Sequence, residues 1–579
     1  LLFLIFIILC FLGKKTVMKK EKSSPFVSTV SLKTFEKLCS IYTICYEHKV
    51  DTSSLSVQLE CSIRNVPKIM KKMSEKGWLH WVSGKGRGNK SVLKILTGFE
   101  GALDETLKHL CTKGRLSDAA DLASRFDYLD TFYGNLAHYL IDNSESSKNT
   151  LLSLVPYTLP ELHPLKVQYA RSKLYIESMF DTLLKYDQSS GQIRPHLAHH
   201  YEYRGNELWL RIRPDIYFHN GERLTPTHIE VCIKNRIEAN DILSLLYRHI
   251  KDVTSNSNWV ILHMSHLDPT ILHLLAELSS SIYLERRDDS SPPYGTGPFK
   301  LESFSSTNWT LASNTHYFSE RPIISRAEFW SIDAHKVPED KFIVHNGTFN
   351  KDIDKGVVFP LNSGCESLEF NCFENGLTLE ERAWIMQNVR VFCEQTASDL
   401  FPVANSVTSY HQDKVFNLPP VECKLPQRSV RFVSPKEKEV KRIALIQYLK
   451  KQGLNIKEVS LVDRNVGEFD VDITGYVPQD DLFFSYYKWL LCSETIEYSV
   501  PENIKTRLVS FIDTLLLKCC DRNDLLAQLY RCEDWLIQNC ISMPLWREHN
   551  SYQISDNVKG TYPDNAGGIP LTRVWISNS

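Results

Sequence analysis

The stretch at residues 53–95 constrains the fold more than any other part of the chain. A short helical segment is followed by a tight turn and then by a second helical pattern that continues to Lys76. Gly77 ends that pattern, and two short apolar segments, residues 78–82 and 91–95, flank a basic, glycine-rich tip. The order helix, turn, helix and hairpin predicts a winged helix-turn-helix domain.

The second helix of this stretch separates an apolar stripe from a polar and basic face. Apolar residues at positions i, i+3, i+4 and i+7 predict one buried stripe. These residues are Val66, Ile69, Met70 and Met73. Short polar and basic side chains near the start of such a helix can reach base edges and phosphates in the major groove of DNA. The candidate DNA-binding residues here are Ser62, Arg64, Asn65, Lys68, Lys71 and Lys72.

The tip between the two apolar segments is rich in glycine and positive charge. Glycines allow such a tip to turn sharply and to lie close to DNA. Lys85, Arg87 and Lys90 suit the phosphates of the DNA backbone. A basic helix alone is usually only a solvated face. The adjoining wing therefore favours double-stranded DNA as the partner.

Two starting points for the second helix remain open. Ser62 is a suitable N-cap, but Pro67 then lies past the first turn, where it removes a backbone donor. If Asn65 is the N-cap instead, Pro67 falls in the first turn and is tolerated.

Helical periodicity extends to both sides of this stretch. Residues 31–47 carry apolar side chains at helical spacing and are the predicted first helix, with residues 48–52 as the loop that follows. Residues 98–149 also have a helical pattern, which is interrupted at Gly114. The polar run at residues 142–147 marks a boundary.

Positive charge is concentrated near the N-terminus. From Met18 to Lys94 there are fifteen Lys or Arg and six Asp or Glu, an excess of nine positive charges. The formal net charge of all 579 residues is only -2, so the remainder is acidic. This asymmetry is typical of a nucleic-acid-binding domain attached to a neutral or acidic body.

Cysteine usage and the first residues bear on localisation. Fifteen cysteines without a C-x-x-C pair do not form a disulfide framework, and no Cys/His set has zinc spacing. We therefore expect a reduced, cytoplasmic protein. Residues 1–12 are apolar, but a membrane span needs about twenty residues. Because Met18 opens a basic segment that is typical of a natural start, we interpret the leader as an early start assignment in preference to an anchor.

The body at residues 150–579 has a different pattern of predicted secondary structure. Short strands alternate with helices, which predicts an α/β architecture with more than one lobe. It contains no Walker lysine, dinucleotide-binding loop, G-x-S-x-G or H-E-x-x-H motif. We therefore predict no enzyme activity, no cofactor and no metal site.

Several motifs of this body resemble the family 5 extracellular solute-binding proteins, which serve peptide and nickel transporters. In residues 209–225, an aromatic and basic strand leads into Phe-His-Asn-Gly and then Leu-Thr, as in that family. The other similar motifs are residues 193–198, 294–299 and 543–546. The resemblance covers roughly residues 150–576 and implies a bilobed, type II periplasmic-binding-protein-like fold.

A body of this kind behind a winged helix resembles the SgrR-like transcriptional regulators of the sugar-phosphate stress response. The similar motifs in the head are residues 61–64, 76–81 and 86–88. The resemblance implies a cytoplasmic regulator that senses a small solute, such as a sugar phosphate or a related metabolite. In that family the regulator activates a small regulatory RNA gene and represses its own gene.

The resemblance also implies partners and a ligand cleft. The expected partners are promoter or operator DNA, a small-molecule effector and RNA polymerase, without stable membrane association. Peptide-binding members place an Asp after a strand to hold the peptide's amino group, whereas this chain has Gln479 at that point. We expect Tyr476 and Gln479 to line the cleft. Pro67 in the recognition helix and the apolar leader are further departures from the family pattern.

The predicted fold is therefore multidomain. It has an apolar leader and tail at residues 1–30, an α+β winged helix-turn-helix domain at 31–98, a helical connector at 99–149 and an α/β bilobed sensor at 150–579. A rival interpretation is a membrane-tethered or exported solute-binding protein of a peptide-type ABC transporter. The basic winged helix is hard to explain in that rival.

Overall fold

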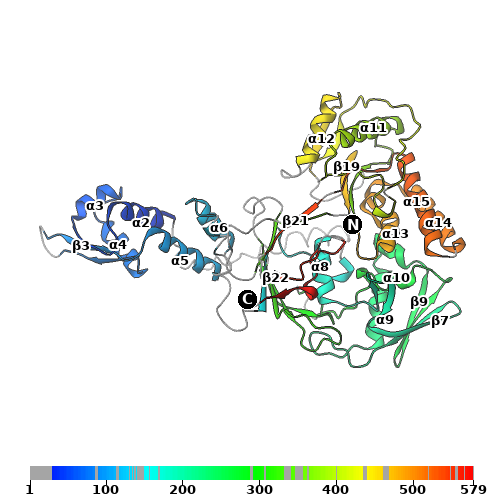
Figure 1. Cartoon of the computed structure of the whole chain (residues 1–579), viewed down its shortest axis with the longest axis horizontal. Coiled ribbons are helices and arrows are strands. Elements are labelled where there is room, and N and C mark those ends of the chain that lie inside the picture. Colours follow the sequence, from blue (N-terminus) through cyan, green and yellow to red (C-terminus); the bar gives the residue numbers. More distant parts are fainter. Residues whose placement is uncertain are drawn as a thin grey trace, which may run out of the picture. The chain divides into compact units, whose positions relative to one another are not determined.

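The chain divides into two compact units, Leu1–Leu140 and Ile141–Ser579, and each is described by itself (Figure 1). The computed structural model describes residues 29–579 apart from a set of gaps. The gaps are residues 85–88, 113–115, 130, 133–134, 136–138, 140–148, 156, 167–169, 287–290, 306–307, 332–340, 346–356, 361–363, 400, 412, 435–439, 461–467, 520, 548, 555–557, 566–567 and 578–579.

Three helices and a three-stranded antiparallel sheet form the N-terminal part of the first unit, the head (Figure 1). The sheet has the order β1-β3-β2, with Leu79 opposite Ile95 across the hairpin. The bounds are α2 Thr29–Ile41, β1 Glu47–Val50, α3 Thr52–Gln58, α4 Val66–Glu75, β2 Leu79–Val82 and β3 Ser91–Ile95. The predicted winged helix-turn-helix is confirmed.

Two expectations for the first helix and the loop after it are wrong. Helix α2 ends at Ile41 instead of extending to residue 47, and Glu47–Val50 is a strand. Cys45 adopts a left-handed φ of 67°, and its N–H donates to Ile95 O at 2.8 Å. The chain leaves the helix early because pairing with the distant strand β3 satisfies its backbone groups.

Apolar side chains join the helices of the head to its sheet. Phe35 and Trp78 are buried, and their ring centroids lie 5.0 Å apart. Gly77 leads the chain from α4 into β2 with a φ of 73°, a left-handed conformation that favours glycine. These contacts fix one face of α4 against the sheet and leave the other face in solvent.

Two further helices belong to the first unit. Helices α5 (Phe99–Thr112) and α6 (Leu116–Ser124) pack against each other, and α5 also contacts α2. Ala102, Leu103 and Leu107 are fully buried. The start of the predicted connector is therefore packed onto the head. The predicted boundary at residues 142–147 lies outside the described residues, and the exact domain limits remain predictions.

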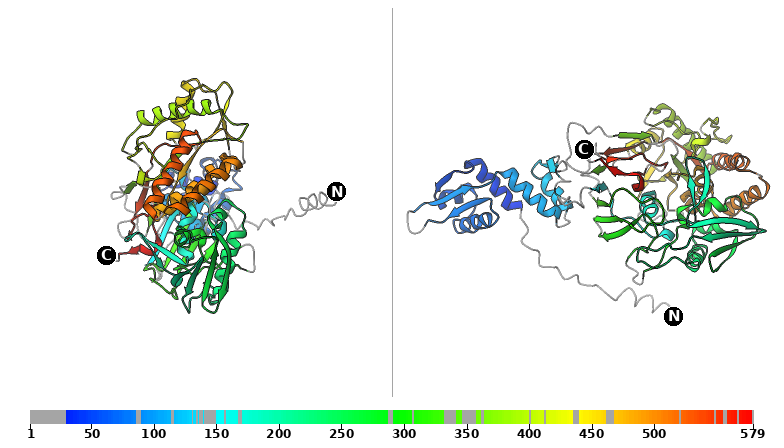
Figure 2. Two further views of the ribbon diagram at one scale, coloured as in Figure 1. Left: turned by 90° about the vertical axis from the view of Figure 1, so that its right-hand side faces the viewer. Right: turned by 60° about the horizontal axis from the view of Figure 1, so that its bottom comes forward.

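The second unit is an α/β structure with three larger sheets (Figures 1 and 2). Their strand orders are β11-β12-β13-β4-β14-β21-β15, β18-β17-β19-β16-β20 and β7-β8-β10-β9. The strands of the first sheet are β4 Thr150–Val155, β11 Phe299–Phe304, β12 Asn308–Ser313, β13 Arg326–Ser331, β14 Lys341–His345, β15 Val357–Pro360 and β21 His549–Ile554. Those of the second are β16 Cys365–Phe370, β17 Val430–Val433, β18 Ile456–Val459, β19 Val471–Tyr476 and β20 Ser542–Pro544. Those of the third are β7 Ala198–Arg204, β8 Glu207–Ile212, β9 Ile250–Asn256 and β10 Trp259–Met264.

Smaller elements complete this unit. Two-stranded sheets pair β5 (Leu184–Asp187) with β6 (Gln192–Pro195) and β22 (Val558–Lys559) with β23 (Trp575–Ile576). The helices are α8 Ala170–Met179, α9 Pro226–Glu238, α10 Ile271–Leu274, α11 Leu379–Gln395, α12 Val440–Lys451, α13 Leu482–Cys492, α14 Glu502–Lys518 and α15 Arg522–Gln538.

Separate hydrophobic cores divide this unit into two lobes. One core combines side chains of the seven-stranded and four-stranded sheets with those of α8, α9 and α13 to α15. The other lies between the five-stranded sheet and helices α11 and α12, which are drawn in yellow-green and yellow, respectively, in Figure 1. The prediction of a bilobed α/β body is confirmed.

The two turns that carried the family resemblance contact each other. The backbone N–H of His219 donates to Gly295 O at 2.9 Å, and its ring Nε2 donates to Gly297 O at 3.1 Å. A Cβ on Gly297 would lie only 2.5 Å from the carbonyl carbon of Met179, so a larger residue does not fit there. Burial lowers the pKa of the His219 imidazole to about 4. These contacts give both motifs a structural role.

The C-terminal segment returns to a helix near the start of this unit. The short helix η7 (Leu571–Arg573), in the red part of the ribbon in Figure 2, packs against α8. None of the helices that the structure describes is long and apolar enough to cross a membrane. The cysteines within the described ranges are all free thiols.

Candidate functional site

The start of helix α4 settles the open choice between two N-caps. Asn65 is the N-cap, and Pro67 lies in the first turn, so the alternative with Ser62 as the cap is wrong. The backbone N–H of Asn65 donates to Ser62 O at 2.8 Å, which closes the turn before the helix. The Asn65 side chain makes no capping hydrogen bond. It is therefore available for another partner.

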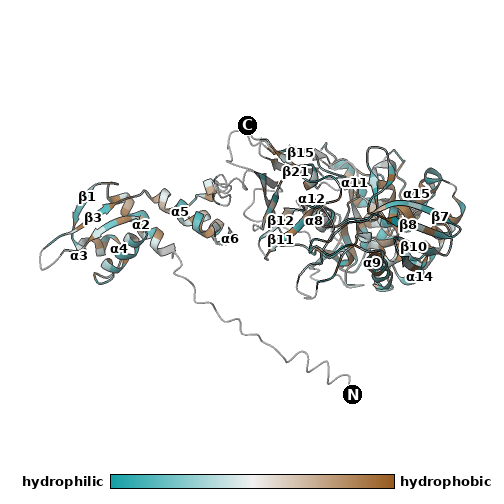
Figure 3. Ribbon diagram, turned by 90° about the horizontal axis from the view of Figure 1, so that it is seen from below, coloured by the Kyte–Doolittle hydropathy of each residue, from teal (hydrophilic) through white to brown (hydrophobic). Residues whose placement is uncertain are grey.

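Helix α4 has the two faces that its sequence predicts. Val66, Met70 and Met73 are buried against the head, whereas Ile69, the fourth residue of the predicted stripe, is only half-buried. All the candidate DNA-binding residues of this segment are exposed, and Figure 3 shows residues of both hydropathy classes on α4. They are Ser62, Arg64, Asn65, Lys68, Lys71 and Lys72. The turn before α4, its N-cap and the helix itself thus present all six side chains to solvent.

The exposed charges of this face are largely unpaired. Among the described residues, Arg64, Lys68 and Lys72 form no ion pair, and Lys71 Nζ lies 3.9 Å from Glu75 Oε1. Burial, together with the charge of Lys72, lowers the pKa of Lys76. The helix therefore carries a positive potential that an external polyanion would neutralise.

The wing is only partly described. Strands β2 and β3 form the hairpin, and Lys90 is exposed at its end. Lys85 and Arg87 lie outside the described residues. Their contacts with DNA remain predictions, as do those of α4.

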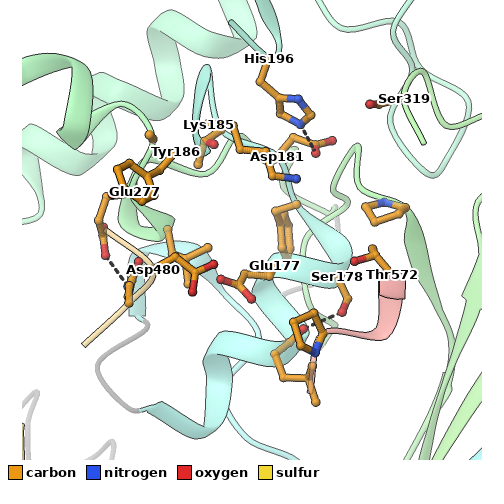
Figure 4. A pocket seen from close by; sticks show the side chains of 18 of the residues that line it. Glu177, Ser178, Asp181, Lys185, Tyr186, His196, Glu277, Ser319, Asp480 and Thr572 are labelled. Atoms are coloured by element: carbon orange, nitrogen blue, oxygen red, sulfur yellow. Dashed lines mark hydrogen bonds and ion pairs between the residues drawn. The ribbon is translucent and has the colours of Figure 1, made fainter. Parts of the chain in front are cut away.

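A cavity of about 540 Å³ lies in the second unit (Figure 4). Its walls come from α8, β5, α10, the segment at residues 317–323, the segment at residues 479–485 and η7. Segments far apart in the sequence thus meet around one space. Its volume suits a small solute.

Acidic side chains outnumber basic ones on the walls of this cavity. Six carboxylates line it, against three Lys or Arg side chains and two histidines. The carboxylates belong to Glu177, Asp181, Glu277, Glu320, Asp480 and Asp481. The basic side chains are Lys185, Arg321 and Arg573, and the histidines are His196 and His273.

Asp181 is held entirely by the protein. Its carboxylate accepts hydrogen bonds from Thr296 Oγ1 and Tyr317 Oη, both at 2.8 Å, and contacts His196 Nε2 at 2.8 Å. Although burial opposes ionisation, His196 and these donors hold the pKa of Asp181 below its usual range. This carboxylate therefore serves the wall of the cavity.

Glu277 is also neutralised within the protein. Its Oε1 accepts from Gln479 Nε2 at 2.7 Å and from Lys488 Nζ at 2.6 Å. Burial opposes its ionisation, but Lys488 and Ser279 hold the pKa of Glu277 below its usual range. The contact connects the segment after β19 to the segment before η4 (Leu278–Ser280).

Asp481 caps helix α13. It accepts from the backbone N–H of Phe484 at 3.1 Å and contacts the ring of His273. Its carboxylate thus has a helix N-terminus and a histidine ring as partners within the protein.

Glu177 and Asp480 are placed differently. Figure 4 shows their carboxyl groups directed toward each other within the cavity. Lys173 Nζ lies 3.5 Å from Glu177 Oε1, but it also binds the carboxylate of Asp564. Burial, opposed by Lys173 and reinforced by Asp564 and Asp480, raises the pKa of Glu177 to about 7.

The predicted cleft residues have different positions. Gln479 lies on the cavity wall, as do Asp480 and Asp481 beside it. Tyr476 is buried in β19, where its ring centroid lies 6.0 Å from that of Trp489, and it does not line this cavity. Ligand contact by either predicted residue remains a prediction. Sequence reasoning missed Glu177, because nothing in its own helix distinguishes it from a surface glutamate.

Within the described parts of the chain, no group of three His, Cys, Asp or Glu side chains is placed to hold a metal ion. The side chains that line the cavity can interact with a solute through their charges and hydrogen bonds.

Comparison with known families covers both units. Residues 31–143 match the family described as Sugar transport-related sRNA regulator N-term. Residues 192–339 match Bacterial extracellular solute-binding proteins, family 5 Middle.

Two relatives match this chain over different shares of their length. The HTH-type transcriptional regulator SgrR of Escherichia coli O157:H7 is 22% identical over 457 residues, which is 76% of this chain and 81% of that protein. The uncharacterized protein YhjP of Bacillus subtilis (strain 168) is 27% identical over 283 residues, which is 47% of this chain and 49% of that protein. The latter match thus spans about half of that relative's length.

Solved structures resemble the second unit. The substrate-binding domain of an oligopeptide ABC transporter from Bacillus anthracis has a TM-score of 0.58 at 13% identity, covering 75% of this chain and 99% of that chain. The binding protein DppA from Helicobacter pylori, in complex with the peptide STSA, has a TM-score of 0.59 at 14% identity, covering 74% and 98%. At these identities the likeness shows the fold alone. The chain is thus SgrR-like, with the N-terminal domain of the sugar transport-related sRNA regulators and a family 5 solute-binding domain on one polypeptide.

Proposed function

We propose that this SgrR-like regulator acts in the cytoplasm, binds promoter DNA through α4 and the adjoining wing, and changes transcription when a small solute enters the cavity of its second unit. The observation that carries the proposal is the exposed basic face of α4, whose buried side is fixed by the head. Activation would further require contact with RNA polymerase.

The geometry of α4 supports recognition of DNA. Phosphate contacts position a protein on the duplex, and contacts to base edges specify the sequence. Arg64 and Asn65 are the side chains nearest the start of the helix, where reading of the major groove takes place. Lys68, Lys71 and Lys72 lie further along the same helix and suit the phosphate backbone.

The second unit supports a sensing role. Two lobes of this kind respond to a solute by moving about a hinge. The solute can regulate only if it binds one arrangement of the lobes better than the other. We propose that such a movement reaches the head through the connector that begins with α5 and α6.

The rival function is an exported or tethered solute-binding protein of a transporter. That function accounts for the fold of the second unit, but it gives no role to the basic face of α4. The match of residues 31–143 to a regulator's N-terminal family also favours the transcriptional role.

The test is selection of duplex DNA from a random pool by the full chain, followed by gel-shift titration of the enriched sequence. We expect one enriched motif and weaker binding by a Lys68→Ala/Lys72→Ala variant. Lys108→Ala is the matched control, because Lys108 is an exposed lysine on α5. No enrichment, or equal losses in both variants, would contradict recognition by α4.

The wing is tested by the dependence of affinity on salt. Neutralising Lys85, Arg87 and Lys90 should reduce the slope of log affinity against log salt by about 0.9 for each DNA phosphate that the wing no longer neutralises. An unchanged slope would show that the wing does not contact DNA.

The sensor is tested by its removal. Deletion of residues 150–579 should leave a head that binds DNA and no longer responds to any solute in a reporter assay. A solute response that survives in the truncated head would contradict the sensing role.

A further inference from the structure

The charge of the cavity limits the class of solute that it accepts. Four of its six carboxylates can be set aside. Asp181, Glu277 and Asp481 have partners within the protein, and Glu320 is exposed at the rim. Glu177 and Asp480 remain as the two acidic groups that face the space without full compensation.

A local shortage of positive charge surrounds this pair. Lys173 is one ammonium group shared by Glu177 and Asp564, and Asp480 lies close enough to add its own negative charge. The side chains of Lys173 and Asp564 are only 7% and 3% exposed, so water screens this imbalance weakly. Three acidic side chains, Glu177, Asp480 and Asp564, thus lie around Lys173, and the exposed Lys185 adds only a weaker attraction to Glu177.

Asp480 shows the same shortage at the level of one atom. Its Oδ1 is buried, and no donor among the described residues forms a hydrogen bond with it. A buried acceptor without a donor is costly, and a native site normally supplies a partner. The side chain of Glu177 is 32% exposed, so a solute within the cavity can reach the pair.

We infer that the effector is a small cationic solute, whose ammonium or guanidinium group lies between the carboxylates of Glu177 and Asp480. This inference rests on the proposed solute-sensing function and names the class of its ligand. A donor-rich cation would supply a hydrogen bond to Asp480 Oδ1 and would balance the charge around Lys173. Gln479 and Tyr186, on the same walls, can contact the uncharged part of the solute.

The same charges disfavour a phosphate group. A phosphate dianion would face Glu177 and Asp480, whose charge is not fully compensated, whereas the three basic side chains of the lining, Lys185, Arg321 and Arg573, are all exposed. Like charges at short distance in a partly desolvated site repel strongly. This cavity therefore differs from the one expected for a sugar phosphate.

Thermal-shift and calorimetric titrations of the full chain test the inference. The cationic probes are 1,4-diaminobutane and glucosamine. Their fully N-acetylated counterparts, N,N′-diacetyl-1,4-diaminobutane and N-acetylglucosamine, are the neutral probes, and glucose 6-phosphate is the anionic probe. We expect at least one cation to raise the Tm of the chain and its N-acetylated counterpart to have no effect, because binding to the native state stabilises it.

Substitutions then locate the site. Glu177→Gln and Asp480→Asn keep the size of each side chain, and each should weaken binding of the cation about tenfold or more, as expected for a charge-assisted hydrogen bond. Lys185→Ala should leave binding unchanged or strengthen it. Glu238→Gln, an exposed glutamate at the end of α9, is the matched control and should leave binding unchanged.

The outcomes separate the inference from the function on which it rests. Stabilisation by glucose 6-phosphate or by the N-acetylated compounds alone would overturn the inference and leave solute sensing intact. Cation binding that neither Glu177→Gln nor Asp480→Asn weakens would also overturn it. If no probe of any charge stabilises the chain, solute sensing itself is contradicted.

Discussion

The basic face of α4 and the acidic cavity of the second unit differ in how their charged side chains are exposed and paired. The cations of α4 are exposed, lie on a single helix and have few partners. The carboxylates of the cavity come from separated segments, and most of them are buried or half-buried and matched by specific donors. An exposed charge costs the fold little and is available to a large polyanion. An enclosed charge must be compensated within the fold or by a solute that fits the space.

The largest expected effect is the difference in free energy of unfolding between losing a partnered carboxylate of the cavity and losing a carboxylate at the surface. Asp181→Ala should lower the free energy of unfolding of the second unit by about 3–5 kcal/mol, because it leaves buried partners such as His196 and Thr296 without their acceptor. Glu458→Ala should cost at most about 1 kcal/mol, since the side chains of the Lys450–Glu458 pair are 44% and 42% exposed. Denaturant titration of both variants measures the difference. Equal costs would break the comparison.

The next effect concerns pH. The folded-state pKa of His219 is lowered to about 4 by burial, whereas an unfolded histidine titrates near about 6.5. As pH falls through this window, the His219 imidazole is protonated in the unfolded state but stays neutral in the folded state. Stability should therefore fall between about pH 6.5 and pH 4, by up to about 3 kcal/mol.

His219→Asn tests this window. The variant should show a shallower dependence of the unfolding free energy on pH, whatever its stability at pH 7. His199→Asn, a change at an exposed histidine, should keep the slope of the parent chain. Identical slopes in all three proteins would contradict the role of His219.

A third prediction concerns the other member of the comparison. Arg64→Ala should cost about 1–3 kcal/mol of specific DNA binding if Arg64 contacts a base edge. Its effect on folding should be small, because the side chain is exposed and forms no ion pair within the described part of the chain. Gel-shift titration measures the first quantity and thermal unfolding the second. An unchanged affinity would remove Arg64 from the interface.

The smallest effect distinguishes a helix cap from a DNA contact at Asn65. A bonded N-cap contributes about 1 kcal/mol, but the Asn65 side chain makes no capping hydrogen bond. Asn65→Ala should therefore change the free energy of unfolding by less than about 0.5 kcal/mol. A drop in DNA affinity at unchanged stability would assign the side chain to DNA. A larger drop in stability would show that it caps the helix.

The comparison also explains how far the sequence could lead. The face of α4 was predictable because its period of 3.6 residues places all its members in one short stretch. The two lobes were predictable from motifs such as the turn that contains His219. Strand β1 was missed, because Glu47–Val50 becomes a strand only through pairing with the distant Ser91–Ile95.

The cavity is a stronger case of the same limit. Gln479 was placed on its wall through the family resemblance. Glu177 and Asp480 gain their significance from each other and from Lys173 and Asp564, and three helical or loop segments must fold before these four meet. No local pattern in the sequence predicts that these four residues lie close together.

The position of β4 in the sheet determines how long after its synthesis this strand can pair with its neighbours. This strand lies inside the seven-stranded sheet, paired with β13 on one side and β14 on the other. Its first residue, Thr150, pairs with Arg326, which is translated 176 residues later (326 minus 150). At about 5–20 residues per second, the ribosome needs on the order of 10 to 35 s to cover that distance. During this time the apolar strand β4 has no partner strand to pair with, whereas all residues of the head have already been synthesised. Ribosome-bound chains that end near residue 300 should therefore carry a folded head and depend on chaperones for the rest.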